Sequence, residues 1–458
     1  MTKRIRIGNA AGFWGDNLDA PRLTCATGRL DYLTLEYLAE LTMSILAHQR
    51  SRDPDAGFVT DFPKVISSLV PILTDQPGLR IVTNAGGMNP SRCAQRVSEI
   101  LAGAGLSEVT VAAVAGDDVL GDLDKHIAEG EQFSHFEMGQ SLGSLREQLI
   151  SGNAYLGARG IVQALAGGAR IVITGRVADA SLTLGPSVHE FGWKWDDWDR
   201  LAAATVAGHV IECGAQATGG IYSDLTEDIS LADVGYPIAE ISEDGSLVIT
   251  KPDDSGGTVS VGSVAEQIVY EIGDPAHYLT PDVDVDFTQV QLSQTGDDRV
   301  SLTGVRGGPR PETLKVSLAY RDGYKLEGTL VVAGRDAAAK ARRAADVILE
   351  RVKRAGHDLD RTNVELLGTG DSVPGVWPAQ AEPWEVVLRI TAHDPSRDAL
   401  SRLSREFAPL VTSGPPGVTG YTGARPKPQQ VLAYWPTTIA RSRVSAEVVV
   451  KRAGEWSA

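Results

Sequence analysis

Arg80-Ile-Val-Thr-Asn-Ala-Gly-Gly-Met-Asn-Pro-Ser91 is a stretch in which a short apolar segment runs into a glycine-rich turn. Residues 80–83 are predicted to form a buried strand, and residues 91–104 are predicted to form a helix. Asn89 and Pro90 suit the start of that helix, because an Asn side chain accepts a free backbone N–H and proline has no N–H to leave unpaired. This strand–turn–helix unit indicates an α/β fold.

The same alternation continues outward in both directions. Further strands are expected at residues 5–8, 109–114 and 170–174, and further helices at residues 31–49, 154–166 and 198–213. Because strands and helices alternate along the chain, we expect an α/β domain with a mainly parallel sheet. This domain is expected to comprise residues 1–235 and to carry the functional site.

The pattern changes after about residue 235. A hairpin is expected at residues 238–250, around the turn Glu243-Asp-Gly, and paired strands and long helices follow it. This order predicts a second, α+β domain at residues 236–458, with helices on one face of a largely antiparallel sheet. Its Gly/Pro-rich loop at residues 413–423 is a candidate lid, or else a cover for a sheet edge.

The bulk composition disfavours several classes of protein. Among 458 residues, 43 are basic and 59 acidic, and the formal charge of -16 argues against nucleic acid or an anionic membrane as a partner. Three widely spaced cysteines, Cys25, Cys93 and Cys213, argue against a disulfide framework or a structural zinc site. The chain opens directly on a strand pattern without a signal peptide, and no apolar run is long enough to span a bilayer. We expect a cytoplasmic homo-oligomer that acts on a small-molecule substrate.

Two strand-end loops offer groups that could bind a ligand. In the loop at residues 83–90, backbone N–H groups and a helix dipole converge on an anion or a carbonyl group. The loop at residues 8–16 follows the first strand, where sheets of this class bind ligands. Both loops are also explained as turns that need flexible residues. The substrate-binding candidates in the two loops are Asn9, Asp16, Asn84, Gly86, Gly87 and Asn89.

A cation and a carboxylate follow the strand at residues 170–174. The segment Thr174-Gly-Arg-Val-Ala-Asp179 supplies Arg176 for substrate binding and Asp179 to orient it. Such a pair suits the carbonyl of an acid or a thioester. An internal salt bridge is the alternative interpretation.

The segment Gly208-His-Val-Ile-Glu-Cys213 carries the sharpest pattern in the chain. His209, Glu212 and Cys213 stand at positions i, i+3 and i+4, so that one helix face presents a base, an acid and a thiol. The three side chains could be a nucleophile with its base, a general acid–base pair, or part of a metal site completed by Asp179 or Asp224. Against these readings, a helical His is often structural and a Cys is often a small buried hydrophobe.

Three further acids lie in the expected helix at residues 31–49. Asp31 occupies an N-cap position, and Glu36 and Glu40 are four residues apart. Helix capping and surface solvation explain at least two of these three acids better than catalysis does.

In combination, these stretches resemble the acyclic terpene utilisation family. The resemblance rests on residues 8–16, 31–40, 83–90, 153–157, 174–179, 208–214, 262–275 and 414–417. It implies a role in the catabolism of branched acyclic terpenoids such as citronellol and geraniol, whose intermediates are coenzyme A thioesters. Longer members carry a C-terminal domain with an Arg-Ser-Gly-Asp-Lys-Gly-type motif, so that a separate subunit is expected to replace that domain here.

The leading hypothesis is a lyase or hydratase that acts on a branched acyl-CoA or a related carboxylic acid. In this hypothesis Asn84 to Asn89 and Arg176 hold the carbonyl or carboxylate, and His209 or Glu212 moves the proton. Coenzyme A enters as part of the substrate, and no other cofactor is expected. The alternatives are a metal-dependent hydrolase, which would need a divalent metal, and a non-catalytic subunit that binds acyl-CoA.

Overall fold

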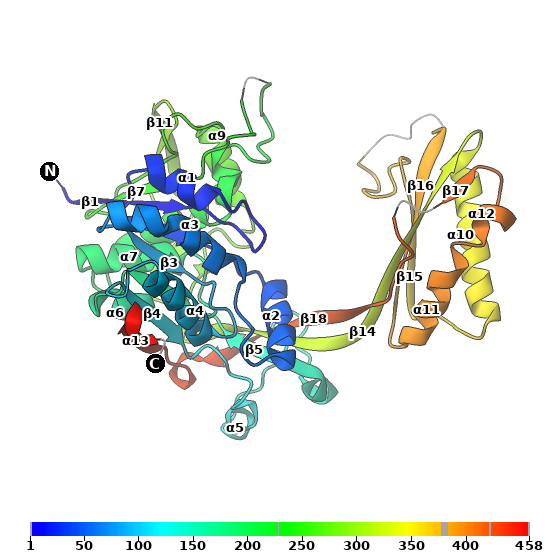
Figure 1. Ribbon diagram of the computed structural model, residues 1–458, viewed down its shortest axis with the longest axis horizontal. Coiled ribbons are helices and arrows are strands. Elements are labelled where there is room, and N and C mark those ends of the chain that lie inside the picture. Colours follow the sequence, from blue (N-terminus) through cyan, green and yellow to red (C-terminus); the bar gives the residue numbers. More distant parts are fainter. Residues whose placement is uncertain (1, 228, 377–382, 421–422, 457–458) are drawn as a thin grey trace. The chain divides into compact units, whose positions relative to one another are not determined.

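The structure is a computed structural model that describes residues 2–227, 229–376, 383–420 and 423–456. It divides into two compact units, Met1–Ala319 with Tyr434–Ala458, and Tyr320–Ala433. Figure 1 shows the elements of both units, many of them labelled. The division does not coincide with the boundary expected near residue 235. The reason is that the hairpin β7 (Ile238–Ser242) and β8 (Leu247–Thr250) extends the first sheet by pairing with its strand β1 (Arg4–Asn9).

A mixed ten-stranded sheet forms the centre of the first unit, in the order β11-β12-β8-β7-β1-β2-β3-β6-β4-β19. Its middle strands are parallel, as the alternating sequence predicts, whereas the flanking strands pair antiparallel. The parallel strands other than β1 are β2 (Tyr32–Leu35), β3 (Arg80–Thr83), β6 (Ile171–Thr174) and β4 (Thr110–Ala115). Their residues are almost all buried, because helices cover both faces of a parallel sheet.

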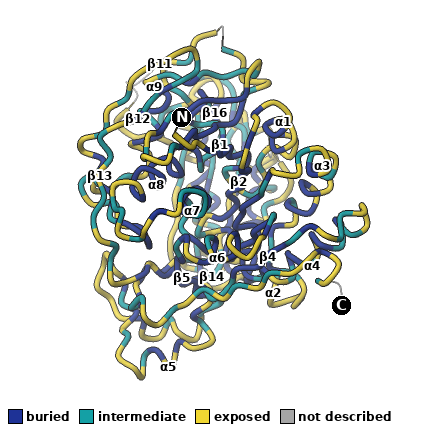
Figure 2. The backbone as a smooth tube through the Cα atoms, turned by 90° about the vertical axis from the view of Figure 1, so that its left-hand side faces the viewer, coloured by how far each residue is buried: buried dark blue, intermediate teal, exposed yellow. Residues whose placement is uncertain are grey.

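Two helical layers cover this sheet. One contains α1 (Ala20–Thr27), α3 (Asp61–Asp75) and α4 (Pro90–Gly103), which pack on a core that includes Ile81 and Ile173. The other contains α6 (Arg159–Ala166), α7 (Ser181–Phe191) and α8 (Trp198–Glu212). Figure 2 shows central strands such as β1 and β2 in dark blue, with exposed yellow residues mainly on the surrounding helices and loops.

The remaining elements of the first unit are shorter or lie at its margins. They are α2 (Glu40–Arg52), α5 (Leu123–Ala128), β5 (Leu149–Ala154), α9 (Val261–Val269), β9 (Tyr278–Leu279), β10 (Asp284–Asp286), β11 (Gln291–Gly296), β12 (Arg299–Thr303), β13 (Arg306–Gly308), β19 (Glu447–Arg452), α13 (Ala453–Trp456) and the 3-10 helices η1 (Gly143–Gln148), η2 (Gly214–Thr218) and η3 (Arg441–Arg443). No helix within the described ranges combines the length and the apolar character needed to cross a membrane.

The second unit is an antiparallel sheet with helices packed on it, in the order β15-β16-β14-β17. It has the α+β character expected for the later part of the chain, and Phe407 and Leu388 lie in its core. The strands β14 and β18 run through both units. The elements are β14 (Thr313–Ala333), α10 (Ala337–Arg354), β15 (Arg361–Leu367), β16 (Glu385–Asp394), α11 (Arg397–Glu406), α12 (Leu410–Ser413), β17 (Val418–Gly420) and β18 (Gln429–Ala440).

The candidate lid at residues 413–423 is only partly described. Its strand β17 pairs with β14 through Val331 and Val332, and the Thr419 hydroxyl donates to the Val331 carbonyl at 3.1 Å. These residues cover a sheet edge inside the second unit. Tyr421 and Thr422 lie outside the described residues.

A glycine sets how closely α8 approaches the start of α7. A Cβ atom at Gly208 would lie 2.7 Å from the Ala180 Cα and 2.8 Å from the Ala180 carbonyl oxygen. Only glycine fits such a distance without displacement of one helix. The close approach places the end of α8 beside the loop that follows β6.

We therefore expect Gly208→Ala to destabilise the protein by about 1–3 kcal/mol, because the added methyl group must push α8 away from Ala180. Urea denaturation measures this loss. Gly103→Ala is the matched control, since nothing lies within 4 Å of the Cβ position at Gly103 in α4. Equal stability of the Gly208→Ala variant and the wild type would contradict the close contact.

Candidate active site

A cavity of about 950 Å³ opens at the carboxyl ends of the parallel strands in the first unit. The loop after β1 supplies Gly12 and Asp16, the residue after β2 is Glu36, and the loop after β6 supplies Arg176 and Asp179. These loops meet because the carboxyl ends of parallel strands lie at one edge of a sheet. The end of α8 adds His209, Glu212 and Cys213 to the lining.

Arg176 is the buried cation of this cavity, with 2% of its surface exposed. Its guanidinium group pairs with Asp179 at 3.0 Å, donates to the Leu38 carbonyl, and lies 4.1 Å from the centre of the Tyr155 ring. Burial lowers the pKa of Arg176, but Asp179 and the neighbouring acidic groups raise it more, so that the side chain stays charged. The Arg176 Nε atom has no hydrogen-bond partner among the described residues.

Glu36 faces the same cation from the loop after β2. One carboxyl oxygen, Oε1, accepts from the Leu38 N–H at 2.8 Å and from the Asn84 amide, whereas Oε2 is buried without a partner among the described residues. Burial and the charge of Asp179 raise the pKa of Glu36 well above its ordinary range, despite Arg176. Burial therefore disfavours the charged form of this carboxyl group.

Asp179 is the group best placed to exchange a proton near neutral pH. Burial raises the pKa of Asp179 to about 7, and the carboxylates of Glu212 and Glu40 add to this effect against the attraction of Arg176. A carboxyl group that titrates near neutrality can act as an acid or a base at physiological pH.

His209 and Glu212 form a pair on α8, as their spacing predicts. The His209 Nδ1 atom lies 3.3 Å from Glu212 Oε1, and Nε2 lies 3.3 Å from the Ile268 carbonyl oxygen. The imidazole packs against Tyr278 and Phe287, with ring centres 5.7 and 5.8 Å away. Burial lowers the pKa of His209, but the contact with Glu212 outweighs it, so that the net direction is upward. His209 is thus held mainly by protein groups, and Glu212 is the more accessible of the two.

Cys213 lines the cavity but is not activated. Burial raises the pKa of its thiol to about 12, and the charge of Glu212 contributes. At neutral pH the sulfur is protonated, and a thiol in this state is a poor nucleophile.

Asp16 and Asn9 hold the loop after β1 in place. Asp16 lines the cavity and accepts from the Gly12 N–H at 2.8 Å and from the Tyr236 hydroxyl at 2.6 Å. Asn9 is buried behind the lining, where its amide donates to the carbonyl groups of Ile211 at 2.7 Å and Glu212 at 3.0 Å. Asn9 therefore fixes the end of α8 relative to β1.

The loop after β3 does not line the cavity. The Asn84 side chain supports the loop after β2 by bonding Glu36 and the Tyr37 N–H. Gly86 approaches β6 so closely that a Cβ atom would lie 2.5 Å from the Thr174 carbonyl oxygen. Gly87 takes φ 49° against Leu46, and Asn89 caps α4 by accepting from the Arg92 N–H at 3.3 Å. Apart from Asn84, which acts through Glu36, this loop serves the fold.

Sequence reasoning missed several lining residues. Helix capping or surface solvation is the expectation for at least two of Asp31, Glu36 and Glu40, but Glu36 and Glu40 both line the cavity. Lys315, at the start of β14, lies 3.0 Å from Glu40 and 4.7 Å from the Tyr155 ring. Burial acts to raise the pKa of Glu40, but Lys315 and the Tyr155 hydroxyl outweigh it and lower the pKa to about 2. Only the four-residue spacing of Glu36 and Glu40 hinted at a shared role.

Apolar side chains surround the polar base of the cavity. Phe13, Phe136, Ile221 and Leu279 line it and are all exposed. Exposed large apolar residues grouped around a cavity are typical of a site that binds an apolar group.

No group of three or more His, Cys, Asp or Glu side chains in the described part of the chain is arranged to hold a metal ion. Asp224, considered as a third ligand beside His209, is exposed and is not among the residues that line the cavity.

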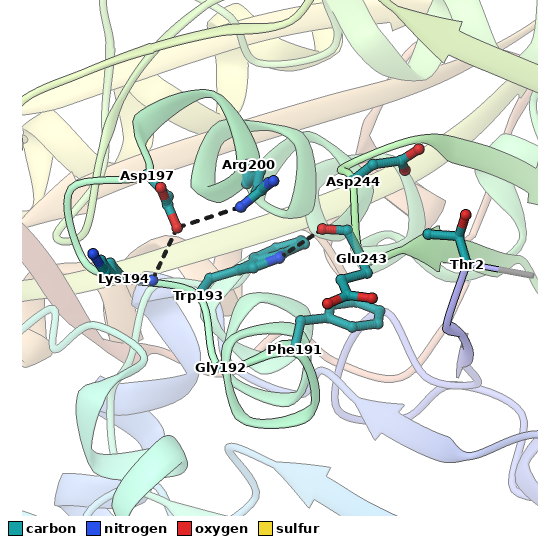
Figure 3. A pocket seen from close by; sticks show the side chains of 9 residues that line it. All are labelled: Thr2, Phe191, Gly192, Trp193, Lys194, Asp197, Arg200, Glu243 and Asp244. Atoms are coloured by element: carbon teal, nitrogen blue, oxygen red, sulfur yellow. Dashed lines mark hydrogen bonds and ion pairs between the residues drawn. The ribbon is translucent and has the colours of Figure 1, made fainter.

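A second, smaller hollow of about 370 Å³ lies near α7 and α8 (Figure 3). Its polar groups bond one another: Asp197 lies 3.6 Å from Arg200, and the Trp193 indole N–H donates to the Glu243 carbonyl at 2.9 Å. These groups are satisfied by the protein, in contrast to the buried carboxyls of the larger cavity.

The fold and the larger cavity define an α/β protein with a candidate active site at its strand carboxyl ends. A family model described as acyclic terpene utilisation family protein AtuA matches residues 5–450. The chain belongs to the acyclic terpene utilisation family, which indicates a role in terpene catabolism. No curated protein and no solved structure matches the chain.

The electrostatics of Asp179 can be measured directly. We expect its carboxyl group to titrate near pH 7 and to shift upward in Arg176→Gln, because Arg176 lowers the pKa of Asp179. Infrared difference spectra of each protein against its Asp179→Asn counterpart report the protonated carboxyl band as a function of pH. Lys315→Met is the control and should give a smaller upward shift, since Lys315 is the weaker of the two cationic influences. An Asp179 that titrates near pH 4 would refute this account of the cavity.

Proposed function

We propose that the cavity is the active site of a catabolic lyase or hydratase that acts on a branched acyl-CoA or a related carboxylic acid. The observation that carries the proposal is the buried Arg176 beside Asp179, a carboxyl group whose pKa is raised to about 7. A fixed cation next to a neutral-pH acid–base group is the combination that such chemistry needs.

In this proposal Arg176 polarises the substrate carbonyl. Its Nε atom is buried without a hydrogen-bond partner among the described residues, and its other nitrogens are anchored by Leu38 and Asp179. A carbonyl oxygen that gains negative charge during reaction is stabilised by a preorganised cation that needs no rearrangement. Glu36 interacts electrostatically with both Arg176 and Asp179, and in this proposal it tunes the charge of both neighbours.

In this proposal Asp179 and Glu212 transfer the protons. A hydratase needs a base that takes a proton from water and an acid that supplies one to the α-carbon. A lyase that cleaves a 3-hydroxyacyl thioester needs a base for the hydroxyl proton and an acid for the released enolate. Asp179 and Glu212 act on each other electrostatically, and His209 holds Glu212 through the contact at 3.3 Å. His209 is therefore a positioning residue, because its contact holds the Glu212 carboxylate in place.

Family membership and the apolar rim support a branched, terpenoid-derived acyl chain. Acyclic terpenoid chains are hydrocarbon with methyl branches, and Phe13, Ile221 and Leu279 offer exposed apolar surface at the cavity. Burial of such a chain supplies binding energy in proportion to its apolar area. A non-catalytic acyl-CoA-binding subunit would need the same rim but not the buried acid–base groups.

We expect Glu212→Gln and Asp179→Asn each to lower kcat on a methyl-branched 3-hydroxyacyl-CoA or 2-enoyl-CoA by about 10²–10⁴-fold, since each removes a proton-transfer group. His209→Ala should lower kcat less, because it removes the support of Glu212 rather than the transferring group. Steady-state kinetics over pH 5–9 measure these effects.

Cys213→Ser is the matched control, because it changes a neighbouring lining residue whose thiol is protonated at neutral pH. It should retain activity. If Glu212→Gln and Asp179→Asn keep full turnover once a substrate is found, the acid–base assignment fails. Binding of acyl-CoA without turnover of any substrate would favour the binding subunit instead. Elemental analysis of the purified protein, together with an activity assay after chelation, tests the alternative of a metal-dependent hydrolase.

A further inference from the structure

Three arginines gather around one buried carboxylate close to the cavity wall. Arg159 begins α6, Arg310 follows β13, and Arg441 begins η3. Each of the three acts electrostatically on the other two and on Asp282. Segments far apart in the sequence thus bring three positive charges to one place in the first unit.

Among the described residues, Asp282 and, for Arg441, Glu312 offset these charges only in part, because burial and the charge of Arg310 still leave the pKa values of Arg159 and Arg441 lowered. Asp282 is buried, and its Oδ2 atom already accepts from the Ala158 N–H at 2.7 Å. Within the described ranges, no carboxylate lies within ion-pair distance of Arg159, Arg310 or Arg441, although most other arginines have such a partner. Burial and the charge of Arg310 lower the pKa of both Arg159 and Arg441. Three like charges that share too few acidic partners are costly, and an anionic ligand relieves that cost.

Two of the arginines are held in place by other groups. The Arg441 Nε and one Nη donate to the Pro311 carbonyl at 3.0 and 2.9 Å, and the Arg159 guanidinium lies 4.1 Å from the centre of the Trp195 ring. Arg310 makes no hydrogen bond within the described part of the chain. Such partly anchored guanidinium groups are preorganised for a phosphate and keep donors free for it.

The cluster adjoins the larger cavity through two proline residues. Pro281 and Pro311 line the cavity, and each is the direct neighbour of a member of the cluster, Asp282 and Arg310. Arg441 binds the carbonyl group of the same Pro311. A long ligand can therefore have one end in the cavity and the other at the arginines.

We propose that Arg159, Arg310 and Arg441 bind the phosphate groups of the coenzyme A moiety while the acyl chain occupies the cavity. This inference rests on the proposed function, which supplies the thioester. The nucleotide end of coenzyme A carries several phosphate charges, which match the unbalanced guanidinium groups. The pantetheine arm then passes along the wall formed by Pro281 and Pro311.

Isothermal titration calorimetry of the full chain tests the site with coenzyme A, adenosine 3′,5′-bisphosphate and pantetheine. We expect Arg310→Ala and Arg159→Gln each to raise the Kd for coenzyme A and the bisphosphate about tenfold, as expected for the loss of a charge-assisted hydrogen bond. Pantetheine has no phosphate, so its binding should not change. Arg310→Ala is the cleaner variant, because Arg310 makes no hydrogen bond within the described part of the chain.

Arg306→Ala is the matched control. Arg306 lies four residues before Arg310 and is exposed, but Asp199 neutralises it at 2.9 Å. Its replacement should leave the Kd unchanged. Equal weakening by all three variants, unchanged affinity in Arg310→Ala, or no binding of coenzyme A to the wild type would each overturn the inference. If the phosphate site fails in one of these ways but the protein still turns over a pantetheine thioester or a free acid, the proposed function stands. If the arginines bind phosphate but no substrate is turned over, the proposed function fails and the phosphate site stands.

Discussion

The buried charge of Arg176 is the constraint on which the site depends. A guanidinium group removed from water is costly unless charges and hydrogen-bond acceptors surround it. Asp179, the Leu38 carbonyl and the face of Tyr155 meet this need, and they come from three different segments. Asp117 completes the arrangement from behind by accepting from the Arg176 backbone N–H at 3.0 Å. The guanidinium group thus links the segments after β2, β5 and β6, and the backbone N–H of the same residue links the loop after β4.

Arg176 alone does not neutralise all the acidic side chains that line the cavity. Asp16, Glu36, Glu40, Asp179, Glu212 and Glu271 line the cavity, against Arg176, Lys315 and His209. Lys315 is the main influence that lowers the pKa of Glu40 to about 2, whereas burial and the charge of Asp179 raise the pKa of Glu36. An additional free carboxylate would enter this excess of negative charge at a cost, but a neutral thioester carbonyl would not. The electrostatics therefore favour the thioester over the free acid among the proposed substrates.

Sequence reasoning located the parts of the site that follow from local spacing. Arg176 and Asp179 come directly after a buried strand, and His209 and Glu212 share a helix face, so that short-range rules bring each pair together. Glu36 was misjudged because residues 31–49 also fit a helical spacing. In the structure, β2 occupies residues 32–35 and α2 begins only at Glu40. Both faces of β2 are buried in the parallel sheet, which removes the alternation that marks a strand.

Other parts of the site depend on pairing between strands that are far apart in the sequence, which local spacing does not predict. Lys315 and Tyr155 reach the cavity from β14 and from the residue after β5, which pair with each other across more than a hundred and fifty residues of sequence. The domain boundary expected near residue 235 depends on long-range pairing in the same way. The local sequence of a hairpin does not indicate that the hairpin will extend an existing sheet, as β7 and β8 do here. The arginine cluster is a further example, because nothing in the local sequence around Arg159, Arg310 or Arg441 predicts a binding site. Only the fold brings all three arginines near Asp282. The catalytic pairs are therefore local features, whereas the surroundings that set their pKa values and select a ligand are products of the tertiary fold.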